Sequence, residues 1–370
     1  MVQNKDKVLM KGNEALAESA VRAGCRFFFG YPITPQTEVS AYLSKTMPKV
    51  GGLFLQAESE VAAINMVYGA ASAGARVMTS SSSPGISLKS EGISYMCGAD
   101  MPCVIINVMR GGPGLGGIQP SQADYYQATR GLGHGDAFLI VYAPSTVQEM
   151  ADYVYAAFDK ADEYRTPVLI LSDGMLGQMM EPVVLPEPKD APTDKPWATT
   201  GTKMARKHNV TNSLYLDPQE LEDTIVERQE RYNKVKENEQ RYDAYLTEDA
   251  DIVVVAYGAT ARVARNAVNA ARAKGIKAGL LRPITLWPFP EKILTELAET
   301  ASAFLCVEMS MGQMIDDVRL SIHDSKPVNF FGHTGGIIPT PDEVLACIEK
   351  SAAGETFNVV PYKSKMKGGE

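Results

Sequence analysis

The chain has 370 residues, which is more than one hydrophobic core usually holds, so we expect two domains. Its hydrophobic fraction of 45% and charged fraction of 22% are typical of an ordinary globular protein in water. The formal net charge of −8, without a cluster of lysine and arginine, argues against nucleic acid and anionic membranes as partners.

The amino terminus and the cysteines indicate a compartment. No apolar stretch near Met1 resembles a signal peptide, and no apolar run is long enough to span a bilayer. The five cysteines are scattered, and none belongs to a C-x-x-C pair. We therefore expect reduced thiols in a cytoplasmic protein, and we do not expect this chain alone to hold an iron–sulfur cluster.

The first strong element is an aromatic strand at residues 26–30, and the loop 31–38 follows it. Pro32 and Pro35 restrict the backbone on either side of Thr34. In open α/β sheets, ligands bind beyond the carboxyl ends of the strands, so this loop is a candidate ligand site. A rigid surface turn is the alternative that the sequence leaves open.

Strands and helices alternate through the first half of the chain. Asn13 is expected to cap a helix that Gly24 ends. Further strands are expected at 53–55, 76–79, 103–109, 138–141 and 167–171, and further helices at 61–70 and 146–164. This alternation predicts a parallel sheet that helices cover on both faces.

The second half begins with a change of composition. Prolines become frequent around 182–196, which indicates a linker. Residues 217–248 form a charged, helix-prone stretch whose charges predict a solvated face, with a partner-docking surface as the alternative. A second series of strands and helices then predicts a smaller α/β domain. Its strands are expected at 251–258, 278–281, 304–308 and 327–331, with helices at 261–274 and before Lys350.

Charged residues at two predicted strand ends are candidates for chemistry. Glu60 opens a small-residue helix, where the helix dipole favours a carboxylate, although an ordinary first-turn acid is the alternative. Arg110 leads from a buried strand into the glycine-rich loop 111–117, where the backbone can approach a ligand, although a surface cation is the alternative. The loop lacks dinucleotide or P-loop spacing. His134 is a candidate ligand contact or a satisfied loop histidine.

Four motifs taken together resemble one family. They are Tyr31-Pro-Ile-Thr-Pro35, Glu58-Ser-Glu60 before an alanine-rich helix, Val108-Met-Arg-Gly-Gly112 and Leu171-Ser-Asp-Gly174. In this order they resemble the α subunit of 2-oxoacid:ferredoxin oxidoreductases, which use thiamine diphosphate. The resemblance runs over nearly the whole chain, including 312–314 and 332–336. Segments 114–117 and 133–136 are more similar to the branched-chain (2-oxoisovalerate) subunits than to the 2-oxoglutarate ones.

The resemblance implies a fold and an activity. It implies a parallel-sheet domain that binds the pyrimidine end of thiamine diphosphate at 1–185 and a smaller, transketolase C-terminal-like α/β domain at 250–355. Residues 186–249 would be the linker with the charged helical stretch, and 356–370 a tail. The implied activity is oxidative decarboxylation of a 2-oxoacid to an acyl-CoA, with electrons passed to ferredoxin through a partner subunit.

The resemblance also implies roles for single residues. Glu60 matches the glutamate that hydrogen-bonds a pyrimidine ring nitrogen of the cofactor. Thr34 and Arg110 match residues that meet the 2-oxo and carboxylate groups of the substrate, a task for which the guanidinium fork is suited. The remaining positions implied at the site are Tyr31, Pro32 and Ile33 for the cofactor, and Gly111, Gly112 and His134 for the substrate.

One motif of thiamine enzymes is absent from the sequence. No Gly-Asp-Gly string that would hold Mg²⁺ and the diphosphate occurs, and Ser172-Asp173-Gly174 is the nearest string. The Mg²⁺ site and the iron–sulfur clusters are therefore expected in a β subunit and other partners, and the chain is expected to bind no metal. A γ subunit, a ferredoxin-like δ subunit, ferredoxin and coenzyme A complete the expected partners. The helix at 61–70 is the expected subunit interface.

Other readings remain open at this point. A 2-oxoglutarate- or pyruvate-type α subunit is the first alternative within the family. A subunit of a 2-oxoacid dehydrogenase or a transketolase-like enzyme is the second, because these enzymes share the pair of domains. A non-catalytic scaffold or small-molecule-binding protein is the alternative outside enzymes.

Overall fold

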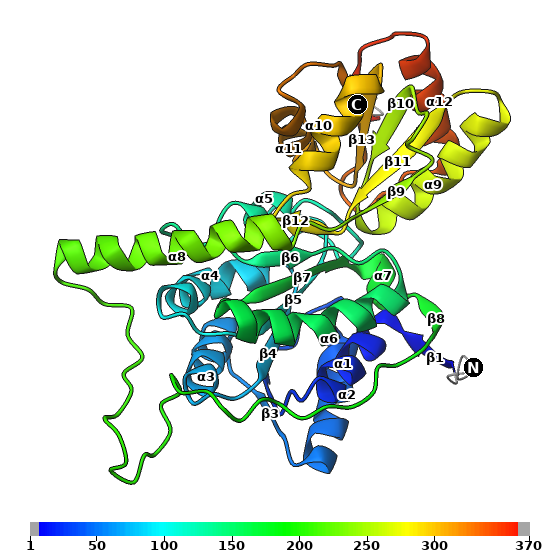
Figure 1. The fold of residues 1–370 in the computed structure, drawn as a ribbon. Helices are drawn as coiled ribbons and strands as arrows, with labels where there is room; N and C mark the ends of the chain where they lie inside the picture. Colours follow the sequence, from blue (N-terminus) through cyan, green and yellow to red (C-terminus); the bar gives the residue numbers. More distant parts are fainter. Residues whose placement is uncertain (1–6, 362–370) are drawn as a thin grey trace, which may run out of the picture.

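The computed structural model describes residues 7–361, which form two α/β lobes joined by a long helix and a crossing strand (Figure 1). The larger lobe contains a seven-stranded sheet with the order β12-β6-β7-β5-β4-β2-β3. The smaller lobe contains a six-stranded sheet with the order β15-β14-β13-β10-β11-β9. The predicted class, α/β with a larger and a smaller parallel-sheet unit, is confirmed.

In the larger lobe, six neighbouring strands run parallel. They are β2 (Phe27–Gly30), β3 (Leu53–Gln56), β4 (Val77–Ser81), β5 (Val104–Met109), β6 (Ile140–Tyr142) and β7 (Val168–Asp173). The helices are α1 (Gly12–Arg22), α2 (Thr37–Thr46), α3 (Glu60–Ser72), α4 (Ser83–Gly98), α5 (Tyr125–Thr129), α6 (Val147–Tyr164) and α7 (Gly174–Gln178). Helices α1 and α6 pack together on one face of the sheet, and α3 and α4 on the other (Figure 1). Strands β4, β5 and β7 are buried along their whole length, as helices on both faces require.

The smaller lobe repeats this arrangement. Its strands are β9 (Tyr242–Tyr245), β10 (Ile252–Val255), β11 (Ala278–Pro283), β13 (Ala303–Glu308), β14 (Val328–Gly332) and β15 (Asn358–Val359). Its helices are α9 (Gly258–Ala273), α10 (Glu291–Thr300), α11 (Met314–Ile322) and α12 (Pro341–Ala352). All pairs are parallel except β9 with β11.

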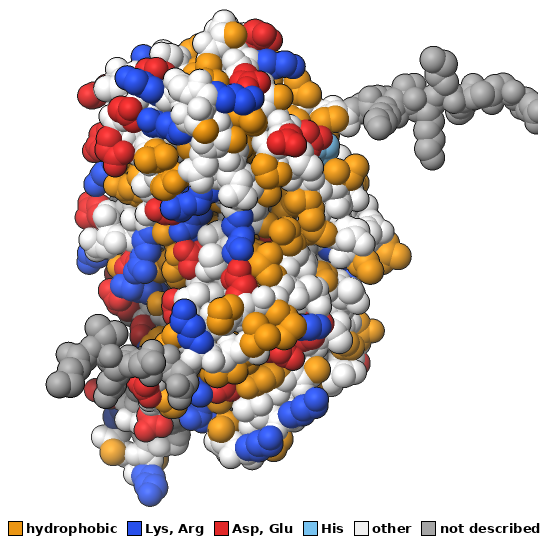
Figure 2. Space-filling model, turned by 90° about the vertical axis from the view of Figure 1, so that its right-hand side faces the viewer, with side chains coloured by type: hydrophobic (Ala, Val, Ile, Leu, Met, Phe, Trp, Pro, Cys, Tyr) orange, Lys and Arg blue, Asp and Glu red, His pale blue; other side chains and the backbone are white. Residues whose placement is uncertain are grey.

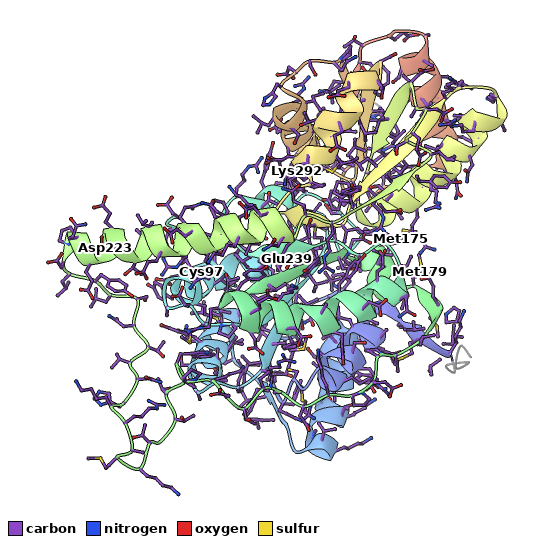
Figure 3. All side chains as sticks on the ribbon, in the orientation of Figure 1. Cys97, Met175, Met179, Asp223, Glu239 and Lys292 are labelled. Atoms are coloured by element: carbon purple, nitrogen blue, oxygen red, sulfur yellow. The ribbon has the colours of Figure 1, made fainter. Side chains whose placement is uncertain are left out.

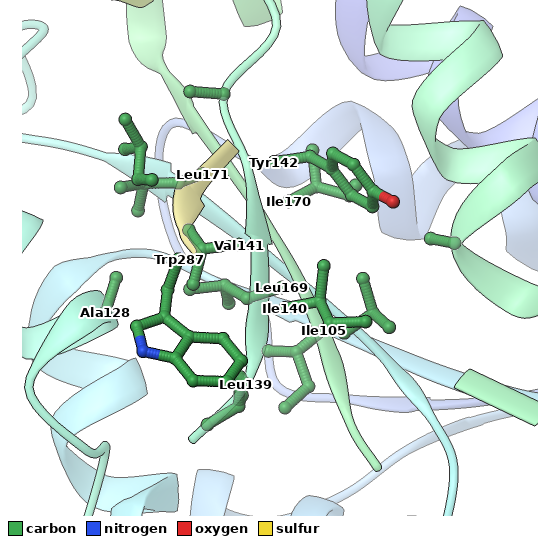
Figure 4. Packing of buried hydrophobic residues seen from close by; sticks show 14 of the residues in the cluster. Ile105, Ala128, Leu139, Ile140, Val141, Tyr142, Leu169, Ile170, Leu171 and Trp287 are labelled. Carbon is green, nitrogen blue, oxygen red and sulfur yellow. The ribbon is translucent and has the colours of Figure 1, made fainter. Parts of the chain in front are cut away.

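One strand from the second half of the chain joins the sheet of the larger lobe. Strand β12 (Thr285–Trp287) follows β11 in the chain but pairs antiparallel with β6 in the larger sheet. Its Trp287 packs among aliphatic side chains of β6 and β7 (Figure 4) and stacks on Phe138 with 4.9 Å between ring centroids. Because this indole is only 8% exposed, the second half of the chain completes the core of the first lobe.

The connection between the lobes has an extended part and a helical part. Strands β1 (Val8–Lys11) and β8 (Met180–Val183) form a separate antiparallel pair, and residues 184–217 after β8 contain no helix or strand. They first lie along the larger lobe and then project away from it before α8 (Pro218–Asn238) begins (Figure 1). Asp223 lies on the projecting half of α8, and Glu239 follows its other end over the first sheet (Figure 3).

Three sequence predictions need correction. Asn13 does not cap α1, because the helix begins at Gly12 and Asn13 is a buried residue of its first turn. The helical stretch expected to reach residue 248 ends at Asn238, because Tyr242–Tyr245 pairs with β11 instead. Helix α4 has no counterpart in the prediction, since its serines and glycines have low helix propensity and the helix is stabilised by tertiary packing.

The surface combines both signs of charge. On the face shown in Figure 2, lysine, arginine, aspartate and glutamate are interleaved, and hydrophobic side chains gather toward the middle. Within residues 7–361, no helix combines the length and the apolar character needed to cross a bilayer.

Candidate functional site

The loop after β2 is held in place from three sides. The Asn13 side chain of α1 donates to the carbonyl oxygen of Pro35 at 2.9 Å. Gln36 is fully buried, and its amide oxygen accepts a hydrogen bond from the Ser80 hydroxyl at the end of β4, at 2.6 Å. Arg110 donates to the carbonyl oxygen of Thr34 at 2.9 Å, while Thr34 itself is exposed. These anchors fix the predicted loop at the carboxyl end of the sheet.

Arg110 lies at the end of β5 and is only 6% exposed. Its Nη1 donates to Thr34, and its Nη2 donates to the carbonyl oxygen of Leu115 at 3.1 Å. Its Nε is buried without a hydrogen-bond partner in the described part of the chain. An unsatisfied buried donor on a cation is unusual in a native structure, and an anionic ligand would satisfy it.

A buried polar cluster contacts the backbone of Arg110. The Ser83 hydroxyl accepts from the Arg110 backbone N–H at 3.1 Å and donates to Asp124 at 2.6 Å. Asn107, within β5, donates to the same Asp124 oxygen at 2.9 Å. Burial raises the pKa of Asp124, and its two hydrogen-bond donors oppose that shift. The sequence analysis did not find this cluster, because its members are far apart along the chain.

Glu60 is the first residue of α3, where the Ser59 hydroxyl caps the helix by accepting from the Ala62 N–H at 3.1 Å. Glu60 is 6% exposed, and its carboxylate accepts no hydrogen bond from any described residue. Gly85 of α4 lies directly against it, since a Cβ built on Gly85 would be 2.7 Å from Glu60 Oε1. The absence of a side chain at Gly85 therefore permits this close approach of α4 to the carboxylate.

The glycine-rich loop joins the site to the smaller lobe. Its ends are brought together by a hydrogen bond from the Gly117 N–H to the Gly111 carbonyl oxygen, at 3.0 Å. The segment 332–336 of the smaller lobe packs on this region. A Cβ on Gly336 would lie 2.3 Å from Cβ of Gln119, so only glycine permits this approach. Two motifs that are distant in the sequence are thus in contact.

Gln122, which lies beside this loop, forms hydrogen bonds between the two lobes. Its side-chain nitrogen donates to the carbonyl oxygen of Tyr257 at 2.8 Å, and its side-chain oxygen accepts from the Met309 N–H at 2.9 Å. Because both partners belong to the smaller lobe, the loops at the carboxyl ends of the two sheets face each other. The candidate site therefore lies near the boundary of the lobes.

The structure brings most of the predicted residues together, but it separates one of them. The loop at 31–35, Arg110, Gly111 and Gly112 are adjacent. His134 instead contacts Ser94 near the end of α4, with 3.1 Å between Nδ1 and Oγ. That position is about 16 Å along the helix from Ser83 at a rise of about 1.5 Å per residue.

The described residues 7–361 contain no group of histidine, cysteine, aspartate and glutamate arranged to hold a metal ion. Asp173, from the string nearest to Gly-Asp-Gly, caps α7 through the N–H groups of Met175 and Leu176. The donor set fits the pyrimidine end of thiamine diphosphate, because Glu60 offers a buried carboxylate without an internal donor. It does not offer the carboxylate set that Mg²⁺ requires.

Fold and geometry together describe an α/β protein with candidate ligand-binding residues at the strand ends. The family described as "Pyruvate flavodoxin/ferredoxin oxidoreductase, thiamine diP-bdg" matches residues 18–247. The family described as "Pyruvate:ferredoxin oxidoreductase core domain II" matches residues 250–344. The chain belongs to this family of 2-oxoacid:ferredoxin oxidoreductases, which confirms the predicted resemblance and makes the chain a subunit of a thiamine diphosphate-dependent oxidoreductase.

Its relatives carry specific names. The chain is 52% identical to the ketoisovalerate oxidoreductase subunit VorB of Methanothermobacter marburgensis, over 94% of this chain and 98% of the relative. It is 36% identical to the 2-oxoglutarate synthase subunit KorA of the same organism, over 92% of this chain and 98% of the relative.

Among solved structures, the chain matches a 2-oxoglutarate:ferredoxin oxidoreductase from Magnetococcus marinus with a TM-score of 0.83 and 28% identity. The match covers 94% of this chain and 66% of that chain. A split-gene transketolase, an inactive β4 tetramer, matches with a TM-score of 0.58 at 16% identity, which is a similarity of fold alone.

Proposed function

We propose that this chain is the α subunit of a thiamine diphosphate-dependent oxidoreductase that converts a branched-chain 2-oxoacid, such as 2-oxoisovalerate, to its acyl-CoA. Electrons would pass to ferredoxin through a partner subunit. The observation that carries the proposal is that two incompletely satisfied groups lie beyond the carboxyl ends of β3 and β5, two strands of the same sheet. Among residues 7–361, none donates a hydrogen bond to Glu60, and none accepts one from the buried Nε–H of Arg110.

Each group has a distinct task in this proposal. The cofactor, when bound, supplies the nucleophilic carbon and accepts the electron pair that decarboxylation releases. Glu60 holds a proton in a hydrogen bond to the pyrimidine ring nitrogen. Arg110 binds the substrate carboxylate, and the Thr34 hydroxyl meets the 2-oxo group. The Leu115 carbonyl belongs to an exposed loop, so a carboxylate can replace it as the acceptor of Arg110 Nη2.

Two observations favour a branched-chain substrate. The relative named for ketoisovalerate is 52% identical to this chain, while the one named for 2-oxoglutarate is 36% identical. The loop beside Arg110 also presents two apolar side chains, Leu115 and Ile118, which are 82% and 58% exposed. An apolar surface suits a branched hydrocarbon better than a second carboxylate. The 2-oxoglutarate- or pyruvate-type subunit is the alternative.

Initial rates of the purified complex with a panel of 2-oxoacids and a one-electron dye test the substrate. We expect the highest kcat/KM with 2-oxoisovalerate. An apolar contact with one or two additional methylene groups should raise kcat/KM roughly 10- to 100-fold over the value for pyruvate. A higher kcat/KM with 2-oxoglutarate would assign the chain to the other subfamily.

The proposal includes partners. A β subunit would bring Mg²⁺, the diphosphate site and an iron–sulfur cluster, and γ and ferredoxin-like δ subunits, ferredoxin and coenzyme A would complete the system. The outer face of α3, which exposes Val61, Asn65 and Gly69, is the proposed interface with the subunit that completes the site. The arm at 199–217 offers further apolar surface, since Met204 is 95% and Leu216 87% exposed.

Calorimetry tests whether the chain needs its partner. We expect the isolated chain to bind thiamine diphosphate weakly even with Mg²⁺, because most of the cofactor's charge would remain uncompensated. Addition of the β subunit should produce tight, Mg²⁺-dependent binding. Tight binding by the chain alone, or oxidation of 2-oxoacids without a partner, would contradict this part of the proposal.

A further inference from the structure

Helix α4 carries a fully buried lysine that the function described so far does not use. Lys89 is 0% exposed, and its Nζ donates to the Thr79 hydroxyl oxygen at 2.7 Å and to the Ser80 carbonyl oxygen at 3.0 Å. Both acceptors belong to the end of β4. Lysine is almost never fully buried without a charged partner, so this position requires a physical explanation.

The packing of α4 on α3 shows which charge lies near Lys89. Gly85 and Gly92, four residues before and three after Lys89, lie on the same face of α4. A Cβ on Gly85 would meet the Glu60 carboxylate at 2.7 Å, and one on Gly92 would meet Ile64 at 2.5 Å. Lys89 is therefore between two close contacts of α4 with α3, on the face that meets Glu60.

The hydrogen bonds of Lys89 leave its charge state open. A neutral amine has two N–H groups, and the two acceptors match them, whereas an ammonium has a third N–H for which the described part of the chain offers no acceptor. Burial lowers the pKa of Lys89 to about 7, and the negative charge of Glu60 is the larger of two opposing effects. The other titratable neighbour is Cys103, whose pKa burial raises well above its usual value, so its thiol stays neutral.

We propose that Lys89 is a positioning residue for Glu60, and that its buried amine is electrostatically coupled to the Glu60 carboxylate before the cofactor binds. No salt bridge joins the two side chains, so the interaction acts through space across a water-poor contact. The inference rests on the proposed function, in which Glu60 faces the pyrimidine ring. Lys89 also donates to the backbone carbonyl oxygen of Ser80, whose hydroxyl donates to Gln36 in the loop after β2.

The coupling can be measured on Lys89 itself in the assembled, cofactor-free complex. NMR of complexes with ¹³C at the lysine ε-carbon would follow its titration, and the signal lost in Lys89→Met would assign it. In Glu60→Gln the titration midpoint of Lys89 should fall by about one pH unit, because the amine loses its anionic neighbour. The matched control is Glu308→Gln, which changes a buried glutamate of the smaller lobe and should leave the midpoint unchanged.

The same interaction should affect the reaction, because removal of the amine changes the electrostatic environment of the carboxylate that faces the cofactor in the proposed function. Lys89→Met should lower kcat about tenfold, the equivalent of one pH unit, while KM for the 2-oxoacid stays constant. Lys45→Met, on the exposed side of α2, is the control and should match the wild type. Lys89→Gln, which keeps an N–H donor for Thr79 and Ser80 but not the charge, should behave as Lys89→Met.

The outcomes separate the two proposals. An unchanged Lys89 midpoint in Glu60→Gln would overturn the coupling, whatever the activity of the variants. If Lys89→Gln restored wild-type kcat while Lys89→Met did not, the role of Lys89 would be hydrogen bonding rather than charge. If the Lys89 midpoint shifted but Glu60→Gln kept full activity, the proposed function of Glu60 would fail while the coupling stood.

Discussion

Two buried glutamates, Glu60 in the larger lobe and Glu308 in the smaller lobe, differ in how the protein satisfies them. Glu308, at the end of β13, is fully buried and accepts hydrogen bonds from the hydroxyl of Ser310 and from three backbone N–H groups. Those N–H groups belong to Gln313, Met314 and Ile315 at the start of α11. Glu60 is nearly as buried, yet it accepts none from the described residues.

In the proposed function, this difference separates a carboxylate with a structural role from one that a ligand completes. Burial raises the pKa of Glu308, and its hydrogen bonds oppose that shift, so the loop 308–315 is organised around the side chain. A buried carboxylate without donors destabilises the fold, and it persists where a ligand supplies the missing partner. The smaller lobe therefore uses its glutamate to build a loop, whereas the larger lobe leaves Glu60 without a donor among the described residues, as the proposed cofactor contact requires.

The largest expected effect concerns Glu60. Glu60→Gln should keep the fold but lower kcat by about 10²–10⁴-fold, the usual contribution of proton-transfer catalysis, or about 3–5 kcal/mol of barrier. Steady-state rates of the assembled complex with a 2-oxoacid and a dye measure this effect. Near wild-type turnover would remove the distinction between the two glutamates.

A third buried carboxylate, Asp173, sharpens the comparison through pH. Burial raises its pKa to about 6 from a usual 3.8, while the backbone N–H donors that it caps lower it. Because the folded-state pKa is the higher one, its stabilising contribution is complete below about 3.8 and is lost as the pH rises through about 6. That loss amounts to at most about 3 kcal/mol. Asp173→Asn keeps the capping oxygen but cannot titrate. It should therefore remove this loss of stability with rising pH from thermal unfolding measurements made between pH 4 and 8.

Arg110 tests the substrate side of the larger lobe. Arg110→Lys keeps the charge but loses the fork, so kcat/KM for 2-oxoacids should fall about 10- to 100-fold. Thr34→Val should act in the same direction more weakly. Calorimetry should find the cofactor affinity unchanged in both variants. If both kept wild-type kinetics with every substrate, the site would not be at these strand ends.

The smallest expected effect on the reaction is that of Glu308, whose replacement changes stability instead. Glu308→Ala leaves several buried backbone donors without an acceptor, so the free energy of unfolding should fall by about 1–3 kcal/mol for each donor that stays unpaired. The kcat of the molecules that remain folded should be unaffected. Chemical denaturation, followed by rates at a temperature well below the unfolding midpoint, separates the two quantities. A loss of kcat at unchanged stability would make Glu308 part of the chemistry.

The sequence by itself determined the class of the fold and the principal candidates. Continuous apolar runs such as 103–109 identify strands buried on both faces, because only helices on both sides of a sheet allow them. Strand ends then point to Thr34, Glu60 and Arg110, since parallel strands end at the same edge of the sheet. The order of the motifs pointed to the family.

Only the tertiary structure decided which groups share the site. Ser83, Asn107 and Asp124 meet beneath Arg110 through hydrogen bonds between distant parts of the chain, and no local pattern encodes those bonds. Strand β12 joins the first sheet because Trp287 finds its apolar partners there, across the lobe boundary. The low helix propensity of its glycines argues against helix α4 from the sequence alone, so the buried position of Lys89 could not be predicted either. In the structure these glycines allow α4 to pack closely against α3.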